Sequence, residues 1–301
     1  MSTSILIILF LKVDFYNVIN ILKRVNLNYL MLALLVSLVG SVFLPADKWR
    51  RVLKGLGYRL GYRKALFIKL GSAPIDVILP LRTGELFKVM YLNKYHGITI
   101  GKSLSSIIFD KILNLWAILV IFFIGINFTR AAISLKIFSL IFILTSIVVW
   151  ERRIWIFLHF FTKKIHLSLN NFVKQLTSAF EEISVKYKIF LGSYSLLDMF
   201  LEIVVFYILF KAMKVELPFN AIVNYAALVM LVSSIPLVLM GMGLREASIL
   251  LVFSKYASPA ILLSLGILIT LISHLLPRMV GLFLLIPFLS RLFGNYQVEN
   301  G

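Results

Sequence analysis

Long apolar runs limit what this chain can fold into more than any other feature of its sequence. Residues 27–44, 131–150 and 189–210 each approach the length that an α-helix needs to cross a lipid bilayer. Because 60% of the 301 residues are apolar and only 15% are charged, one soluble core could not cover this much apolar surface. We therefore expect an all-α, polytopic protein in the cell membrane.

The remaining apolar runs complete a bundle of about seven or eight transmembrane helices with two broken or re-entrant elements. We expect Pro45 to close the first span and Pro277-Arg278 to mark a turn or kink between the last two spans. The further predicted spans are residues 104–126, 218–240, 259–276 and 279–293, and the broken elements are residues 65–81 and 241–256.

The charge distribution predicts how the chain lies in the membrane. The net charge of +18 comes from basic residues clustered between apolar runs, which is typical of cytoplasmic loops and makes a nucleic-acid partner unnecessary. This rule places residues 46–64 in the cytoplasm. An amphipathic helix over residues 15–24 and basic, aromatic helices over residues 151–188 are expected at the membrane surface.

These patterns fit one integral membrane domain over residues 1–301. Its first half is about residues 1–150, the surface helices follow over about 151–188, and the second half is about 189–295. The chain has no cysteine, and its four histidines lack zinc-site spacing. We therefore expect no metal site and no cofactor.

Two similar phrases, one in each half, predict the functional site. Residues 79–85 read Leu-Pro-Leu-Arg-Thr-Gly-Glu and residues 240–246 read Met-Gly-Met-Gly-Leu-Arg-Glu. A charge at bilayer depth costs about 2.5–3.5 kcal/mol on insertion scales, so adjacent Arg and Glu in apolar surroundings suggest a function. The predicted helix breaks are Pro74, Pro80, Gly84, Pro236, Gly241 and Gly243.

The first phrase has two interpretations. A helix that begins after Pro80 points free backbone N–H groups at the site, and Arg82 adds a planar fork of donors suited to phosphate. Alternatively, Arg82 and Glu85 neutralise each other as an ion pair that only keeps the broken helix folded.

Other charged residues lie in or beside spans. Asp110 and Lys111 begin the span at residues 104–126, and Asp110 is the stronger functional candidate. Asp198 fits an interfacial residue better than a proton relay. Glu202 needs a cationic partner such as Arg245, Arg278 or Lys111, and His274 fits a residue that packs and hydrogen-bonds between helices.

Four stretches together carry a resemblance to a known family: residues 74–88, the Asp110-Lys111 pair, residues 241–246, and Arg278-Met-Val-Gly281. In order and spacing, over about residues 5–293, the chain resembles the lysylphosphatidylglycerol synthase transmembrane region, a flippase-like group that includes uncharacterised UPF0104 membrane proteins. Three positions differ from the usual pattern: Lys111 and Asn114 stand where the family often has Arg and an acid, and Met240 replaces a glycine.

The resemblance implies a lipid-translocating module with inverted halves and re-entrant helices in a prokaryotic cytoplasmic membrane. Bifunctional members carry a soluble aminoacyl-transfer domain after the membrane region. This sequence ends at Gly301 without one, so we expect no lipid aminoacylation and no enzyme activity.

The sequence thus predicts translocation of a phosphate-bearing lipid, such as an anionic or aminoacylated phospholipid or a polyprenyl-phosphate-linked sugar. The alternatives are an enzyme acting on lipid phosphates and a membrane subunit that docks a cell-envelope glycosyltransferase through residues 151–188; a homo-oligomer also stays open. Arginines are expected to hold the phosphate while acids orient them. The predicted binding residues are Arg82, Glu85, Lys88, Asp110, Lys111, Arg245, Glu246 and Arg278.

Overall fold

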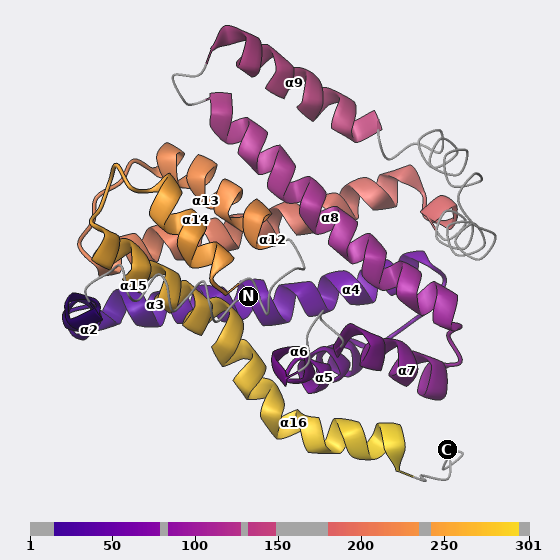
Figure 1. The fold of residues 1–301 in the computed structure, drawn as a ribbon. Coiled ribbons are helices and arrows are strands. Elements are labelled where there is room, and N and C mark those ends of the chain that lie inside the picture. Colours follow the sequence, from indigo (N-terminus) through magenta and orange to yellow (C-terminus); the bar gives the residue numbers. More distant parts are fainter. Residues whose placement is uncertain (1–14, 79–83, 128–131, 149–179, 235–241, 295–301) are drawn as a thin grey trace.

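The computed structural model describes residues 15–78, 84–127, 132–148, 180–234 and 242–294, and every regular element in these ranges is helical (Figure 1). Their order and bounds are α2 (Phe15–Lys23), α3 (Leu27–Leu38), η1 (Val39–Phe43), α4 (Leu44–Gly55), α5 (Tyr62–Ser72), α6 (Ile75–Ile78), α7 (Gly84–His96), α8 (Ile100–Asn127), α9 (Ile133–Val148), α12 (Val185–Ala212), α13 (Phe219–Ser233), α14 (Leu244–Val252), α15 (Pro259–Ile269), η4 (Thr270–Leu275) and α16 (Leu276–Phe293).

Both halves place shorter helices between two long ones. Four described stretches are long and apolar enough to cross a membrane: Leu27–Gly55, Ile100–Asn127, Val185–Ala212 and Pro259–Phe293. Helices α5 and α7 lie between the first two stretches in the chain, and α13 and α14 lie between the last two. This order confirms an all-α polytopic fold.

Fewer separate spans are present among the described residues than the sequence predicted. Besides the four long stretches, Ile133–Leu144 and Phe219–Ser233 are shorter apolar helices. The predicted spans at residues 259–276 and 279–293 belong to one continuous helical stretch of 35 residues. Figure 1 shows this stretch bending, and Pro287 lies inside its last helix.

Two prolines that we expected to end or separate spans lie inside continuous helical stretches. Pro45 is in the first turn of α4, directly after the π-helical segment η1, and Pro277 has the same place in α16 after η4. A proline lacks the N–H that an α-helix needs, and a π segment shifts the local hydrogen-bond pattern. The first helix therefore continues past Pro45 to Gly55.

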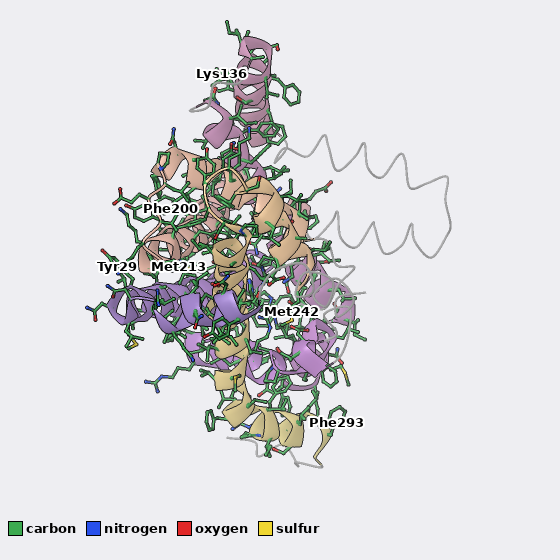
Figure 2. The ribbon with its side chains drawn as sticks, turned by 60° about the vertical axis from the view of Figure 1, so that its left-hand side comes forward. Tyr29, Lys136, Phe200, Met213, Met242 and Phe293 are labelled. Carbon is green, nitrogen blue, oxygen red and sulfur yellow. The ribbon has the colours of Figure 1, made fainter. Side chains whose placement is uncertain are left out.

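The two largest apolar clusters among the described residues join most of the helices. The larger is built around α12 and includes Ile203, Phe206 and Ile269. The second joins α4, α5, α7 and α16 through residues such as Trp49 and Phe288. In Figure 2, Lys136 on α9 and Phe293 on α16 mark opposite ends of the molecule, and the second cluster reaches the Phe293 end through Leu292.

The amphipathic N-terminal helix is confirmed as α2, which ends at Lys23. Its buried Val18 packs against Leu263 of α15. Residues 149–179, which contain most of the predicted surface helices, lie outside the described residues, and so does most of the predicted boundary between the halves. Their position at a membrane surface stays a prediction.

Candidate functional site

A cavity of about 180 Å³ is lined by both halves of the chain. The first half contributes η1, α4, α5, α6, α7 and α8, and the second contributes α12, η4 and α16. Its lining is rich in ionisable side chains: Lys69, Asp76, Glu85, Lys88, Asp110, Lys111, Glu202, His274 and Arg278. This concentration of charge among membrane-spanning helices makes the cavity the candidate site.

Lys48 connects two carboxylates beside this cavity. Its Nζ lies 3.2 Å from Asp110 Oδ1 and 3.1 Å from Asp198 Oδ2, and it donates a hydrogen bond to Asn114 Oδ1. The Lys48 side chain is completely buried. An acid at position 114 would give the ammonium a third carboxylate, so the amide of Asn114 suits a site that already holds two.

The sequence analysis did not pair these two residues. Lys48 was counted with the cytoplasmic basic cluster, and Asp198 was interpreted as interfacial, yet Asp198 is only 5% exposed. Lys48 lies one helical turn before Val52 and beside Trp49, both buried. This spacing on an apolar helix face was the signal that could have identified Lys48.

Glu85 holds two lysines at another part of the cavity wall. Its carboxylate lies 2.8 Å from Lys88 Nζ and 2.9 Å from Lys111 Nζ. Lys88 Nζ also lies 5.6 Å from the centre of the Trp49 ring, a distance suited to a cation–π contact. Glu85 is in the first turn of α7, where the helix dipole favours a negative charge.

Asp76 contacts the first residue of α7, and the sequence analysis did not assign Asp76 to the site. The backbone N–H of Gly84 donates to Asp76 Oδ1 at 2.8 Å. A Cβ at position 84 would lie 2.6 Å from that oxygen and 2.6 Å from the carbonyl oxygen of Ser72, so only glycine fits there. Pro74, also predicted as a helix break, lies between α5 and α6.

Lys69 differs from the other lysines at the site because it has no close partner. Within the part of the chain that the structure describes, its Nζ makes no ion pair and no hydrogen bond, although it lines the cavity. The sequence analysis did not select Lys69 as a binding residue. An ammonium facing a cavity without a close carboxylate is suited to an anionic ligand.

Glu202 of α12 and His274 of η4 lie next to each other in the cavity wall formed by the second half of the chain. Their Oε1 and Nε2 atoms are 3.6 Å apart, and each side chain is 22% exposed. One turn after His274, Arg278 Nη1 donates to the His274 carbonyl oxygen. Among the three partners proposed for Glu202 from the sequence, Arg245 and Arg278 act on it electrostatically, but histidine is its ion-pair neighbour.

The second phrase forms a separate buried network that does not line the cavity. Arg245 Nη1 donates to Thr270 Oγ1 at 2.8 Å, and this hydroxyl donates to Glu246 Oε1 at 2.7 Å. The other Glu246 oxygen accepts the N–H of Gly243 at 2.6 Å. Gly243 has a φ of 88°, which favours glycine, and α14 begins at the next residue.

The structure therefore brings five of the eight predicted binding residues to one cavity: Glu85, Lys88, Asp110, Lys111 and Arg278. Arg245 and Glu246 belong to the neighbouring Thr270 network. Arg82 and the predicted helix-break residues Pro80, Pro236 and Gly241 lie outside the described residues. The ligand that these residues bind stays a prediction.

Comparison with known proteins agrees with the resemblance found in the sequence. The family model of the lysylphosphatidylglycerol synthase TM region matches residues 1–281. The chain is 24% identical, over 317 aligned positions covering 93% of each chain, to UPF0104 membrane protein MJ1595 of Methanocaldococcus jannaschii. A family match over nearly the whole length, together with the helical fold, assigns the family. The protein is a multi-pass membrane protein that belongs to the lysylphosphatidylglycerol synthase transmembrane-region family.

Proposed function

We propose that the protein moves a phosphate-bearing lipid across the membrane and that the cavity between the halves receives the lipid headgroup. The observation that carries this proposal is the Lys69 ammonium in the cavity wall, which has no ion-pair or hydrogen-bond partner among the described residues. A lipid phosphate supplies the negative charge that this ammonium lacks, while the acyl or prenyl chains stay in the bilayer. The protein then acts as a transporter and not as an enzyme.

The charges around the cavity support an anionic ligand of low net charge. Five cations face five carboxylates: Lys48, Lys69, Lys88, Lys111 and Arg278 against Asp76, Glu85, Asp110, Asp198 and Glu202. Charges that balance in this way cost less free energy at bilayer depth than unpaired charges do. Binding of one monoanionic phosphate changes the net charge of the set by −1. Asp110 and Asp198 neutralise Lys48, which leaves Lys69 and the lysines held by Glu85 to contact phosphate.

Both lipid classes that the sequence suggested present the same phosphate. An anionic phospholipid and a polyprenyl phosphate differ in the rest of the headgroup and in their chains, so direct comparison distinguishes them. Docking of a glycosyltransferase through residues 151–188 and formation of a homo-oligomer stay predictions, because residues 149–179 lie outside the described ranges.

Lys69→Gln should slow lipid movement by about 10- to 100-fold, because a hydrogen bond to a charged group contributes about 1.5–3 kcal/mol. The measurement uses the purified protein in liposomes with trace labelled phosphatidylglycerol or labelled polyprenyl phosphate in separate preparations. Lys64→Gln is the matched control, since Lys64 is on the same helix but exposed. Empty vesicles give the spontaneous rate.

Selective movement of one lipid, lost in Lys69→Gln and kept in Lys64→Gln, would support the proposal and identify the lipid class. Equal rates for Lys69→Gln and the unchanged protein would show that the Lys69 ammonium does not hold the phosphate. Movement of neither lipid by the unchanged protein would contradict translocation of these two classes.

A further inference from the structure

We propose that Glu202 and His274 form a proton-binding site and that a proton crosses the membrane together with the anionic lipid. This inference rests on the proposed function, since it names the ion that is coupled to lipid movement. It assigns to the cavity a second ligand, the proton, which binds at Glu202 Oε1 and His274 Nε2.

Glu202 is held differently from every other described carboxylate at the cavity. Asp110 and Asp198 contact Lys48, Glu85 contacts two lysines, and Asp76 accepts the N–H of Gly84. In the described ranges, the only ion-pair neighbour of Glu202 is His274, and the 3.6 Å separation is longer than a hydrogen bond. The carboxylate is therefore not fixed in one charge state by a permanent cation.

The surroundings of the pair add charges of both signs. Arg245 and Arg278 place positive charge near Glu202, and Asp198, one turn away on α12, places negative charge near it. Lys48 of α4 lies 3.1 Å from Asp198 and 3.2 Å from Asp110 of α8, and these three charged groups together carry a net charge of −1. The described parts of α3, η1, α13 and α15 contribute no Asp, Glu, Lys, Arg or His to the faces packed on α12.

The pair can change its proton content without leaving a large uncompensated charge. When it holds one proton it is neutral, whether that proton is on the imidazole or on the carboxylate. A second proton makes it +1, and this charge is compensated when a monoanionic phosphate enters the same cavity. Phosphate binding therefore favours proton uptake from water, and phosphate release favours proton loss to water; no electron is transferred.

His274 lies within the π segment η4, next to a helix–helix hydrogen bond. Ser37 of α3 donates to the carbonyl oxygen of Ile272 at 3.1 Å. The adjacent Ser273 is 3% exposed and lines the cavity, and its hydroxyl has no hydrogen-bond partner in the described structure. A buried hydroxyl of this kind can bond a water or a ligand oxygen beside the pair.

If proton movement is coupled to lipid movement, a pH gradient across the membrane should concentrate the lipid in one leaflet. In liposomes with the membrane potential clamped, a difference of one pH unit should shift the steady-state leaflet ratio of labelled lipid by up to about tenfold, because one unit corresponds to 1.36 kcal/mol. The lipid should gather on the more alkaline side. With Glu202→Gln the ratio should equal the ratio without a gradient. Lys64→Gln, exposed and distant from the pair in the chain, should accumulate lipid like the unchanged protein.

A spectroscopic measurement tests the proton site without lipid transport. Infrared difference spectra of the purified protein between about pH 5 and about pH 8, the range in which histidine titrates, should show a protonated-carboxyl band that Glu202→Gln removes. His274→Gln should shift the frequency of this band, because it removes the imidazole beside the carboxyl group. If Glu202→Gln does not fold, His274→Gln serves as the variant that tests the site.

The outcomes separate the two proposals. Lipid that equilibrates between leaflets but ignores the pH gradient would overturn proton coupling and leave translocation standing. Unchanged accumulation in Glu202→Gln would overturn the assignment of this site. Vesicles that move no lipid would contradict translocation, and an infrared band unaffected by both variants would then also remove the proton site.

Discussion

Lys48→Met should lower the free energy of unfolding by about 3–5 kcal/mol, because it leaves two carboxylates buried without their cation. Asp110 and Asp198 lie 3.2 and 3.1 Å from Lys48 Nζ, on helices α8 and α12, so the change affects three helices at once. The expected result is a large decrease in the midpoint of thermal unfolding in detergent, measured by circular dichroism.

Two variants make this result specific to the ion pairs. Lys64→Met removes an exposed lysine and should leave the midpoint nearly unchanged. Adding Asp110→Asn and Asp198→Asn to Lys48→Met removes the buried negative charges and should restore much of the lost stability, since whole buried ion clusters can be replaced at little cost. A midpoint for Lys48→Met equal to that of the unchanged protein would show that the cluster does not hold these helices together.

Gly281→Ala should separate α16 from α5 and destabilise the protein by about 1–3 kcal/mol, the usual cost of overpacking. A Cβ at position 281 would lie 2.3 Å from the carbonyl oxygen of Leu70 and 3.0 Å from Pro74 Cδ. Because the first of these is a backbone atom, the helices themselves must move apart. Small residues allow this kind of close helix approach within membranes.

Thermal unfolding in detergent measures this effect as well, and the chain offers a matched control. Gly61 is exposed, has an ordinary φ of −68°, and a Cβ there meets nothing within 4 Å. Gly61 is the N-cap of α5, where glycine is preferred over alanine, so Gly61→Ala should lower stability by no more than about 1 kcal/mol. Equal stabilities for the two alanine variants would mean that α5 and α16 are not held at this distance.

Much of the helical fold follows from the sequence because apolar run length predicts long membrane helices directly. Residues 104–126 and 189–210 lie within α8 and α12. Pro45 and Pro277 were misinterpreted because a proline indicates only a missing N–H, and the preceding π segments cannot be recognised from composition. The continuity of Leu27–Gly55 and Pro259–Phe293 therefore required the structure.

The candidate site was predictable where the charged residues interrupt apolar runs. Glu85, Lys88, Asp110 and Lys111 were identified in this way, whereas Lys48 was counted as a cytoplasmic charge. Sequence alone also could not show how Arg245 and Glu246 meet. Adjacent residues on a helix point about 100° apart, so these two connect through Thr270 and not directly.

The π segments η1 and η4 make the cavity wall tolerant of a change of one residue in helix length. Each residue added to or removed from a regular α-helix turns everything beyond it by about 100°. A π segment takes up one extra residue within a turn, so a single deletion inside Thr270–Leu275 closes the segment to an α-helical turn and leaves Arg278 facing the cavity. The same deletion inside the α-helical Pro259–Ile269 has no such turn to absorb it and changes the facing of the residues before it relative to α16. Among related chains, one residue fewer within η1 or η4 thus means a plain α-helix with the same side chains around the same space.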